Sequence, residues 1–494
     1  MSPRPPETDL CFTPATELGR LYRARKTSPA EVMDAVLARV AAVNPRVNAI
    51  VTLDADGARA QARKATASLR RGARVGPLHG VPITIKDVTQ TRGMRTTFGS
   101  TLFGDHVPEE DALVVARLRA AGAIVIGKTN TPEFAFGPNT FNDVFGPTRN
   151  PWNLARTSGG SSGGAAAALA TGMGPLAEGS DLGGSLRGPA AFCAVIGFRT
   201  TPGMVPRYPS TLPWDTYSVE GPMARTVADT ALMLSVMAGI DDRAPLSYPV
   251  DARELLASTK SPSVRGWRVA WTPDLGGVNQ VDAEVRRVFD DAVEGFEELG
   301  AKVVEAAPDM RDVPEIVRLS RGLLMVARHA DKLPQWRAKL QPGLVENTEA
   351  GLAMSTRDVA QGELLRGKLW QSVRAFLEVH DLLLTPTAAV PPFPVEQPHP
   401  MSIDGRPIGK AMQRSFLTYA FSVMGLPAIS VPAGFTSEGL PVGLQIVGRR
   451  RQEAMVLRAA AAFEAARPWA HRRPPVLADV AAAPVGRPPS PRQR

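Results

Sequence analysis

The strongest constraint on the fold of this chain is a pair of glycine- and serine-rich clusters, SGGSSGG at residues 158–164 and DLGGSLRG at residues 181–188. Clusters of this kind often form flexible linkers, but the run between them, AAAALATGMGPLAE, is apolar and should pack. A strand-like run, CAVIGFRTT, follows the second cluster. Because glycine allows two backbones to approach closely, we expect this segment inside a packed core. The residue types leave two interpretations open, a structural turn and a nucleophilic serine surrounded by backbone N–H groups.

Helical and strand-like periodicities alternate along the chain, which indicates an α/β fold with a sheet of mixed direction. We expect helices at residues 28–43, 54–74, 109–122, 163–172, 281–299, 311–331, 358–379 and 453–466, and strands at 80–87, 123–127, 193–201, 428–434 and 440–448. At ~150 residues per domain, the 494 residues allow about three domains. Residues 1–75 are expected to form a helical N-terminal layer, and the basic, proline-rich stretch 471–494 to be disordered.

The composition disfavours several classes of protein. The formal net charge is +9, but the last 24 residues hold five arginines, and no internal basic run alternates with aromatic residues, so no nucleic-acid partner is expected. Two cysteines, Cys11 and Cys193, make no disulfide framework, and the six scattered histidines have no metal-binding spacing. We therefore expect neither a metal nor a cofactor. The sequence shows no secretory signal and no run of about 18 apolar residues, which favours a cytoplasmic protein without a membrane segment.

Two short matches to well-known motifs fail on their context. GAIVIGKT at residues 122–129 has the letters of a P-loop, but its middle prefers a β-strand, and its helix precedes the match instead of following it. GGSSG at residues 159–163 has the letters of a nucleophile elbow, but the preceding run RNPWNLARTS does not resemble the apolar strand that an elbow needs. An elbow also needs a late histidine, for which only His471 is placed. A P-loop nucleotide-binding protein is kept only as an alternative function.

One long segment of the chain resembles a known protein family. The run GGSSGGAAAALATGMGPLAEGSDLGGSLRGPAAFC at residues 159–193 is similar to the defining sequence of the amidase signature family of serine hydrolases. Other blocks that resemble the family are PLHGVPITIKDV (77–88), GAIVIGKTNTPEF (122–134), FGPTRNPWN (145–153) and GLPAISVPAGF to GLPVGLQIVG (425–448). The resemblance runs from about residue 15 to 466 and is least specific from about 245 to 380. It implies a single large α/β domain, a mixed sheet flanked by helices, with its core at residues 76–470.

The resemblance also implies a Ser–cis-Ser–Lys catalytic apparatus, which falls here on Ser185, Ser161 and Lys86. Ser185 is the implied nucleophile and forms an acyl-enzyme with the substrate carbonyl. Ser161, which follows a cis peptide bond from Gly160, relays the proton between Ser185 and Lys86. Lys86 ends an apolar run, where desolvation would lower its pKa and let the neutral amine act as a base. The oxyanion would be held by the backbone N–H groups of Leu182, Gly183, Gly184 and Ser185.

Further residues are expected to support this apparatus. Gly160 relieves crowding at the cis bond, the Ser162 hydroxyl bonds locally, and Asp181 pairs with Arg187 across the turn that carries the nucleophile. Lys128 is interpreted as structural. By the resemblance, the acyl pocket is lined by the loop after GKTN, by the segment after the signature and by the late proline-rich loop. The candidates in these stretches are Phe134, Phe136, Gly137, Phe141, Tyr208, Trp214 and Phe393.

The substrate class depends on features that the chain lacks. The glutamine-using members of the family hold their substrate with a charged pair that includes an acid just before the GLPA block. The corresponding stretch here, SFLTYAFSVMGLPA at residues 415–428, contains no acid, which disfavours the alternative of a glutamine-amidotransferase-type subunit. The absence of a long apolar N-terminal helix disfavours the membrane-bound fatty-amide type. We therefore expect an amidase for small uncharged, apolar or aryl amides, with esters and carbamates as further substrates. The sequence leaves open whether the chain forms a homodimer.

Overall fold

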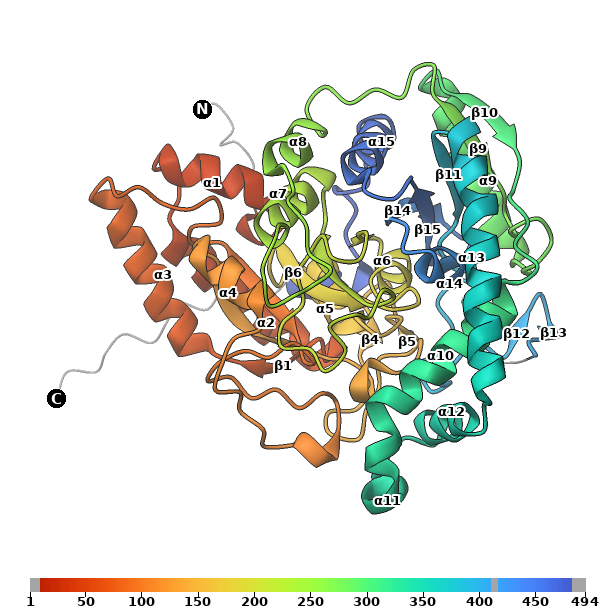
Figure 1. Ribbon diagram of the computed structural model, residues 1–494. Coiled ribbons are helices and arrows are strands. Elements are labelled where there is room, and N and C mark those ends of the chain that lie inside the picture. Colours follow the sequence, from red (N-terminus) through yellow and green to blue (C-terminus); the bar gives the residue numbers. More distant parts are fainter. Residues whose placement is uncertain (1–8, 410–415, 482–494) are drawn as a thin grey trace.

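A mixed β-sheet forms the centre of the structure, a computed structural model that describes residues 9–409 and 416–481 (Figure 1). Within these residues, eleven strands make one sheet in the order β1-β3-β2-β6-β8-β7-β14-β15-β11-β9-β10. They are β1 (Ile50–Leu53), β2 (Pro82–Lys86), β3 (Ile124–Thr129), β6 (Leu176–Asp181), β7 (Ile196–Arg199), β8 (Val219–Ala224), β9 (Arg268–Trp271), β10 (Lys302–Glu305), β11 (Leu382–Pro386), β14 (Ala428–Phe435) and β15 (Pro441–Val447). β2 runs parallel to β3 and β6, and β9 runs parallel to β10 and β11, whereas the other neighbours are antiparallel. The mixed sheet predicted from the sequence is confirmed.

Helices cover both faces of this sheet (Figure 1). They are α1 (Ala15–Arg23), α2 (Pro29–Val47), α3 (Ala55–Arg70), α4 (Leu113–Ala120), α5 (Gly163–Ala170), α6 (Arg187–Cys193), α7 (Val227–Met237), α8 (Ala252–Ala257), α9 (Ala283–Glu298), α10 (Val313–His329), α11 (Leu333–Trp336), α12 (Pro342–Leu352), α13 (Thr356–Val379), α14 (Phe416–Val423), α15 (Glu453–Ala466) and α16 (Ala478–Ala481). Two small hairpins lie outside the large sheet, β4 (Arg149–Asn150) with β5 (Asn153–Thr157), and β12 (Ser402–Ile403) with β13 (Arg406–Pro407).

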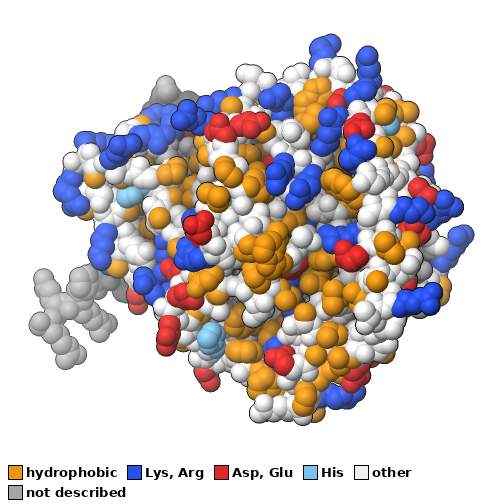
Figure 2. Space-filling model, viewed as in Figure 1, with side chains coloured by type: hydrophobic (Ala, Val, Ile, Leu, Met, Phe, Trp, Pro, Cys, Tyr) orange, Lys and Arg blue, Asp and Glu red, His pale blue; other side chains and the backbone are white. Residues whose placement is uncertain are grey.

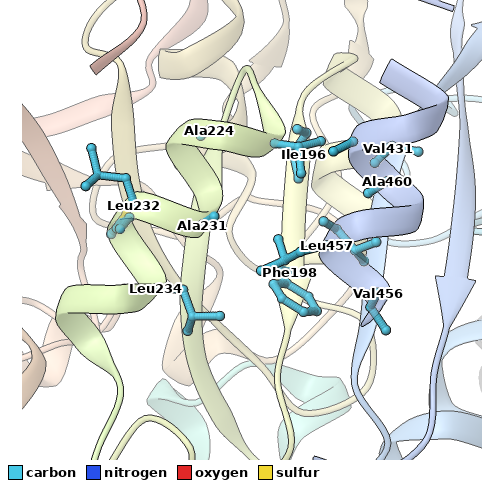
Figure 3. Close-up of a cluster of buried hydrophobic side chains, with 14 of the residues drawn as sticks. Ile196, Phe198, Ala224, Ala231, Leu232, Leu234, Val431, Val456, Leu457 and Ala460 are labelled. Carbon is cyan, nitrogen blue, oxygen red and sulfur yellow. The ribbon is translucent and has the colours of Figure 1, made fainter. Parts of the chain in front are cut away.

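The core divides into two main layers because successive strand residues point to opposite faces of the sheet. Val431 of β14 belongs to a cluster that includes Phe198 of β7 and Leu457 of α15. Figure 3 shows this cluster, in which side chains of β7 lie between those of α7 and α15. Ala428, three residues before Val431, belongs instead to a cluster on the other face that includes Phe421 of α14. Both faces of the central strands are therefore buried.

The N-terminal layer shows how the sequence pattern specifies a helix. Ser28 caps α2, since its Oγ accepts a hydrogen bond from the backbone N–H of Glu31 at 3.3 Å. The valines that recur at helical spacing face the core, and Val32, Val36, Val40 and Val43 are all buried. The layer is not purely helical, however. Ile50–Leu53 forms β1, which pairs with β3 at one edge of the large sheet, because this run combines β-branched residues with a hydrogen-bonding partner.

The predicted disorder of residues 471–494 is wrong for part of that stretch. Pro475–Leu477 forms a short 3-10 helix and Ala478–Ala481 forms α16. Val476 and Leu477 are buried against the N-terminal layer, which supplies the apolar contact that a disordered tail lacks. The rest of the predicted tail, residues 482–494, lies outside the described residues.

Candidate active site

The signature segment folds around the ends of two parallel strands. β2 ends at Lys86 and its parallel neighbour β6 ends at Asp181, so the chain leaves both strands at the same edge of the sheet. The turn that precedes α5 carries Ser161, and the turn that follows β6 carries Ser185. The two turns are linked because the backbone N–H of Ser162 donates to the carbonyl oxygen of Ser185 at 3.1 Å. Two glycine- and serine-rich clusters that are separate in the sequence thus meet beside one lysine.

Serine hydroxyls surround the amine of Lys86, a residue with no exposed surface. The Nζ donates to Ser161 Oγ at 2.7 Å, to Ser162 Oγ at 2.9 Å and to Ser180 Oγ at 3.0 Å. Sequence reasoning identified the first two serines and missed Ser180, although it lies inside the signature run. Residue spacing gave no signal for it, because its contact with Lys86 depends on the pairing of β2 with β6.

Burial lowers the pKa of Lys86 to about 7, although the carboxylates of Glu178 and Asp181 oppose this shift. A desolvated ammonium is costly, so the neutral amine gains population near neutral pH. Glu178 also fixes the end of β2, because its Oε2 accepts a hydrogen bond from the backbone N–H of Lys86 at 3.1 Å. The lysine is thus held in place in a form that can accept a proton.

The turn before α5 has the geometry that the family resemblance predicts. The peptide bond between Gly160 and Ser161 is cis. Gly160 has no space for a side chain, since a Cβ there would lie 2.6 Å from the carbonyl oxygen of Gly137. The Ser162 hydroxyl donates locally, to the carbonyl oxygen of Ser180 at 3.3 Å. Ser161 and Ser162 are both fully buried, so the turn is part of the packed interior and not a linker.

A buried ion pair shapes the turn that carries Ser185. Arg187 donates to both carboxylate oxygens of Asp181, at 2.9 and 3.0 Å, and Arg199 donates to one of them at 3.2 Å. Burial alone would raise the pKa of Asp181, but the two guanidinium groups hold it well below its usual range. The predicted pairing of Asp181 with Arg187 is confirmed. Arg199 was not expected there.

The same carboxylate changes the predicted set of oxyanion donors. Asp181 Oδ1 accepts the backbone N–H of Gly184 at 2.8 Å, so this N–H is already engaged. The prediction that Gly184 donates to an oxyanion is therefore corrected. The N–H groups of Leu182, Gly183 and Ser185 make no hydrogen bond within the described residues. Those three donors are left for an oxyanion.

A cavity of about 1030 Å³ lies beside Ser161 and Ser185. Pockets of this size accommodate drug-sized ligands. Of the predicted pocket residues, Phe134, Phe136, Gly137, Phe141 and Phe393 line the cavity. Three phenylalanines that were not predicted, Phe98, Phe103 and Phe192, extend this aromatic lining. Figure 2 shows hydrophobic side chains gathered near the middle of the face viewed in Figure 1, with charged side chains around them.

Two predicted pocket residues lie elsewhere. Tyr208 does not line the cavity and stacks instead beneath Arg243, whose Cζ lies 4.9 Å from the centre of the ring. Trp214 also lies outside the lining, and 70% of its surface is exposed. The neighbouring residues 209–212 do reach the cavity. The segment was thus correctly chosen, but its two aromatic side chains point away.

The two rejected motifs also have clear structural fates. Lys128 of GAIVIGKT lies in strand β3, fully buried, and donates to Thr89 O and, at 2.8 Å, to Thr91 Oγ1. A strand cannot form the phosphate-binding loop, so this match is structural. The expectation that no strand precedes GGSSG is wrong, since β5 does precede it, but β5 pairs with β4 outside the large sheet and His471 is exposed. Neither match forms the site of its namesake.

Metal-binding clusters and membrane-spanning helices were sought as well. In residues 9–409 and 416–481, no group of three or more His, Cys, Asp or Glu side chains could hold a metal ion. None of the helices described there combines the length and the apolar character needed to cross a bilayer.

Comparison with known proteins agrees with this geometry. Residues 31–457 match the family model for amidases. The chain belongs to the amidase family. An acylamidase of Rhodococcus erythropolis is 42% identical over 471 residues, which cover 95% of this chain and 98% of that protein. The crystal structure of a bacterial aryl acylamidase of the amidase signature family matches this amidase with a TM-score of 0.86 at 31% identity, covering 93% of this chain and 97% of that chain.

A second group of relatives carries a different description. One of them, the A-type component of the glutamyl-tRNA(Gln) amidotransferase of Acidothermus cellulolyticus, is 36% identical over 487 residues, which cover 93% of this chain and 95% of that protein. As a member of the amidase family, the protein is an enzyme that hydrolyses amide C–N bonds. The acylamidase match is the stronger of the two in identity and coverage.

Proposed function

We propose that this amidase hydrolyses amides with aryl or other apolar groups through an acyl-enzyme on Ser185. One observation carries the proposal: a buried Lys86 bonded to Ser161 stands beside a phenylalanine-lined cavity that also contains Ser185. An amine with a lowered pKa activates a hydroxyl, and aromatic walls favour an aryl group. The similarity to an acylamidase and to an aryl acylamidase supports the same substrate class.

In the proposed mechanism the proton moves along the chain of hydroxyls. Neutral Lys86 accepts a proton from Ser161, which accepts one from Ser185 as the Ser185 Oγ attacks the substrate carbonyl. The oxyanion that forms is stabilised by the free N–H groups of Leu182 and Gly183, together with that of Ser185. When the C–N bond breaks, Ser161 returns the proton to the leaving amine. Water then attacks the acyl-enzyme by the same route and restores the Ser185 hydroxyl.

Esters and carbamates are proposed as further substrates, since their carbonyls follow the same path. A panel of acetanilide, aliphatic amides, carbamates and p-nitrophenyl esters tests the substrate class. We expect anilides and apolar esters to be hydrolysed with higher kcat/KM than short polar amides, because the cavity lining is largely aromatic. A fluorophosphonate should label Ser185, as seen by peptide mass spectrometry. Labelling at another serine, or no hydrolysis of any apolar amide, would reject the proposal.

The pH dependence of this reaction should follow the lysine. Since Lys86 must be neutral to act as a base and its pKa is lowered to about 7, kcat/KM for an anilide should rise as the pH increases through about 7. Protonated Lys86 dominates below that value and cannot accept the serine proton. The measurement is kcat/KM between about pH 5 and pH 9 at constant ionic strength. A profile that stays flat across this range would exclude Lys86 as the titrating base.

The amidotransferase-type subunit is the second candidate, and the 36% identical relative favours it. The absence of an acid in residues 415–428 argues against a site for the glutamine zwitterion. Glutaminase activity comparable to anilide hydrolysis would reverse this order. A homodimer, a cytoplasmic location and the lack of a nucleic-acid partner stay predictions. Sedimentation of the purified chain tests the first of them.

A further inference from the structure

A guanidinium group on the cavity wall lacks a carboxylate partner. Arg321 of α10 and Tyr419 of α14 line the same cavity as Ser185. We propose that Arg321 and the Tyr419 hydroxyl bind a carboxylate carried by the amide substrate, within a few bonds of the scissile carbonyl. The proposal rests on the amidase chemistry proposed at Ser185 and adds a second anchoring point to it.

Neighbouring side chains hold Arg321 in a fixed orientation. Its Cζ lies 4.7 Å from the centre of the Phe136 ring, a distance typical of a cation–π contact. Its Nε donates to Asn347 Oδ1 at 3.0 Å, and its Nη1 donates to the Tyr419 hydroxyl. A guanidinium that is already oriented loses little conformational entropy when a ligand binds. The group is therefore prepared for recognition.

The charge of Arg321 is not neutralised by the parts of the chain that the structure describes. There, its Nη2 makes no hydrogen bond, and no carboxylate oxygen lies within ion-pair distance of its side chain. Two other basic residues of the same wall do have acidic partners: Arg328 pairs with Asp215 at 2.5 Å, and Lys332 pairs with Asp331 at 3.1 Å. A substrate carboxylate would supply the partner that Arg321 lacks.

The Tyr419 hydroxyl provides a second donor. A phenolic oxygen that accepts a hydrogen bond from Arg321 keeps its own proton for donation. Within the described residues, that proton has no acceptor. The Nη2 of Arg321 and the Tyr419 O–H thus offer two donors to one anionic group. Glu346, the acid that also lines this wall, is exposed, so solvent screens its repulsion of a carboxylate.

This pair of donors lies close to the proposed oxyanion site. A Cβ on Gly183 would stand 2.1 Å from Cζ of Tyr419, the ring carbon that bears the hydroxyl. Only one C–O bond and one hydrogen bond separate that carbon from Arg321. Because the Gly183 N–H is a proposed oxyanion donor, a substrate held there has its carboxylate within a few bonds of its carbonyl.

Two matched pairs of substrates test the proposal. In the acyl arm, N-phenylsuccinamate is compared with 4-methyl-N-phenylpentanamide, and in the amine arm 4-acetamidobenzoate is compared with 4-isopropylacetanilide. Each pair exchanges a carboxylate for an isopropyl group of similar shape. Arg321→Met should lower kcat/KM for the carboxylate member of one arm by about 10- to 100-fold, mainly through KM, because a charge-assisted hydrogen bond is lost. The neutral member should change less than about twofold. The arm that responds identifies the side of the substrate that meets Arg321.

Two further variants separate recognition from structural support. Tyr419→Phe keeps the ring beside Gly183 and removes only the hydroxyl, so it should also weaken the carboxylate substrate selectively. Arg318→Met is the matched control. Arg318 lies on the same helix, but it is ion-paired with Glu315 at 2.7 Å and does not line the cavity. This variant should leave both members of each pair unchanged.

Several outcomes would overturn the carboxylate site. Equal losses for the charged and neutral substrates in Arg321→Met and in Tyr419→Phe would show that the two residues only support the fold of the turn. An unchanged kcat/KM for both carboxylate substrates in Arg321→Met would show that no carboxylate binds there. If the wild-type enzyme hydrolyses the neutral anilides and labels at Ser185, either result rejects the carboxylate site alone. If it hydrolyses no anilide and shows no labelling, the proposed function fails first.

Discussion

Replacing Ser185 by alanine is expected to lower kcat for anilide hydrolysis by about 10,000-fold or more, because no acyl-enzyme forms without the attacking oxygen. Substrate binding should survive, since the change removes one hydroxyl from the wall of a cavity of about 1030 Å³. Residual hydrolysis would come from the N–H groups of Leu182 and Gly183, which still stabilise an oxyanion. The measurements are kcat and KM for acetanilide, and the protein mass after treatment with a fluorophosphonate, which should not increase at this residue.

Ser263→Ala is the matched control for this variant. Ser263 is exposed and does not line the cavity, so its loss should leave both kcat and labelling unchanged. If Ser185→Ala kept more than about one-hundredth of the wild-type kcat, the nucleophile would have to be another residue. Ser161 would then be the first serine to test, because it also lines the cavity and bonds to Lys86.

Replacing Lys86 by methionine is expected to lower kcat/KM for anilides by about 1,000-fold or more, because no base remains to accept the serine proton. The loss should be smaller for p-nitrophenyl esters, whose leaving group departs without being protonated. The rise of kcat/KM through about pH 7 should disappear, since the group whose pKa is lowered to that value is gone. Steady-state kinetics on both substrate classes across the pH range measure all three effects.

Lys128→Met provides a demanding control for the second prediction. Lys128 is as fully buried as Lys86, but its amine bonds to Thr89 and Thr91 instead of the serines. Activity per folded molecule should therefore survive in Lys128→Met, with circular dichroism and thermal unfolding used to establish the folded fraction. Comparable losses of activity per folded molecule in the two variants would mean that any buried lysine of this region matters only for the fold.

The elements that could be predicted are those whose own residues carry a strong pattern. α2 has a cap at Ser28 and a regular valine stripe, and β3 has an uninterrupted apolar run. β6 was missed because LAEGSD is rich in residues that disfavour strands. It forms a strand because β2 and β8 pair with it on both sides. Such pairing joins segments far apart in the chain, which local periodicity cannot reveal.

The candidate site divides in the same way. Lys86, Ser161 and Ser185 could be located because they lie in runs that resemble a known family. The engagement of the Gly184 N–H by Asp181 could not, because it depends on how a carboxylate is oriented within a folded turn. Aromatic side chains were chosen by their place in a loop, and the direction in which Tyr208 points is decided by its contact with Arg243.

Arg321 was out of reach for a further reason. It lies on α10, in the stretch where the resemblance is least specific, and a lone arginine on a helix usually faces solvent. Only the packing of α10 against α12 and α14 places it beside Asn347 and Tyr419. The cavity therefore contains a charged element that composition alone does not predict in an otherwise aromatic site.

The placement of α10 has a consequence for how this enzyme can diversify. The reacting groups lie on β2, on β6 and in the turns that follow, whereas Arg321, Met325 and Arg328 reach the cavity from one side of a single helix, at spacings of four and three residues. Gene duplicates could thus acquire new diets by drifting at three codons while inheriting unaltered chemistry. A combinatorial library restricted to these positions would exploit the same separation in the laboratory.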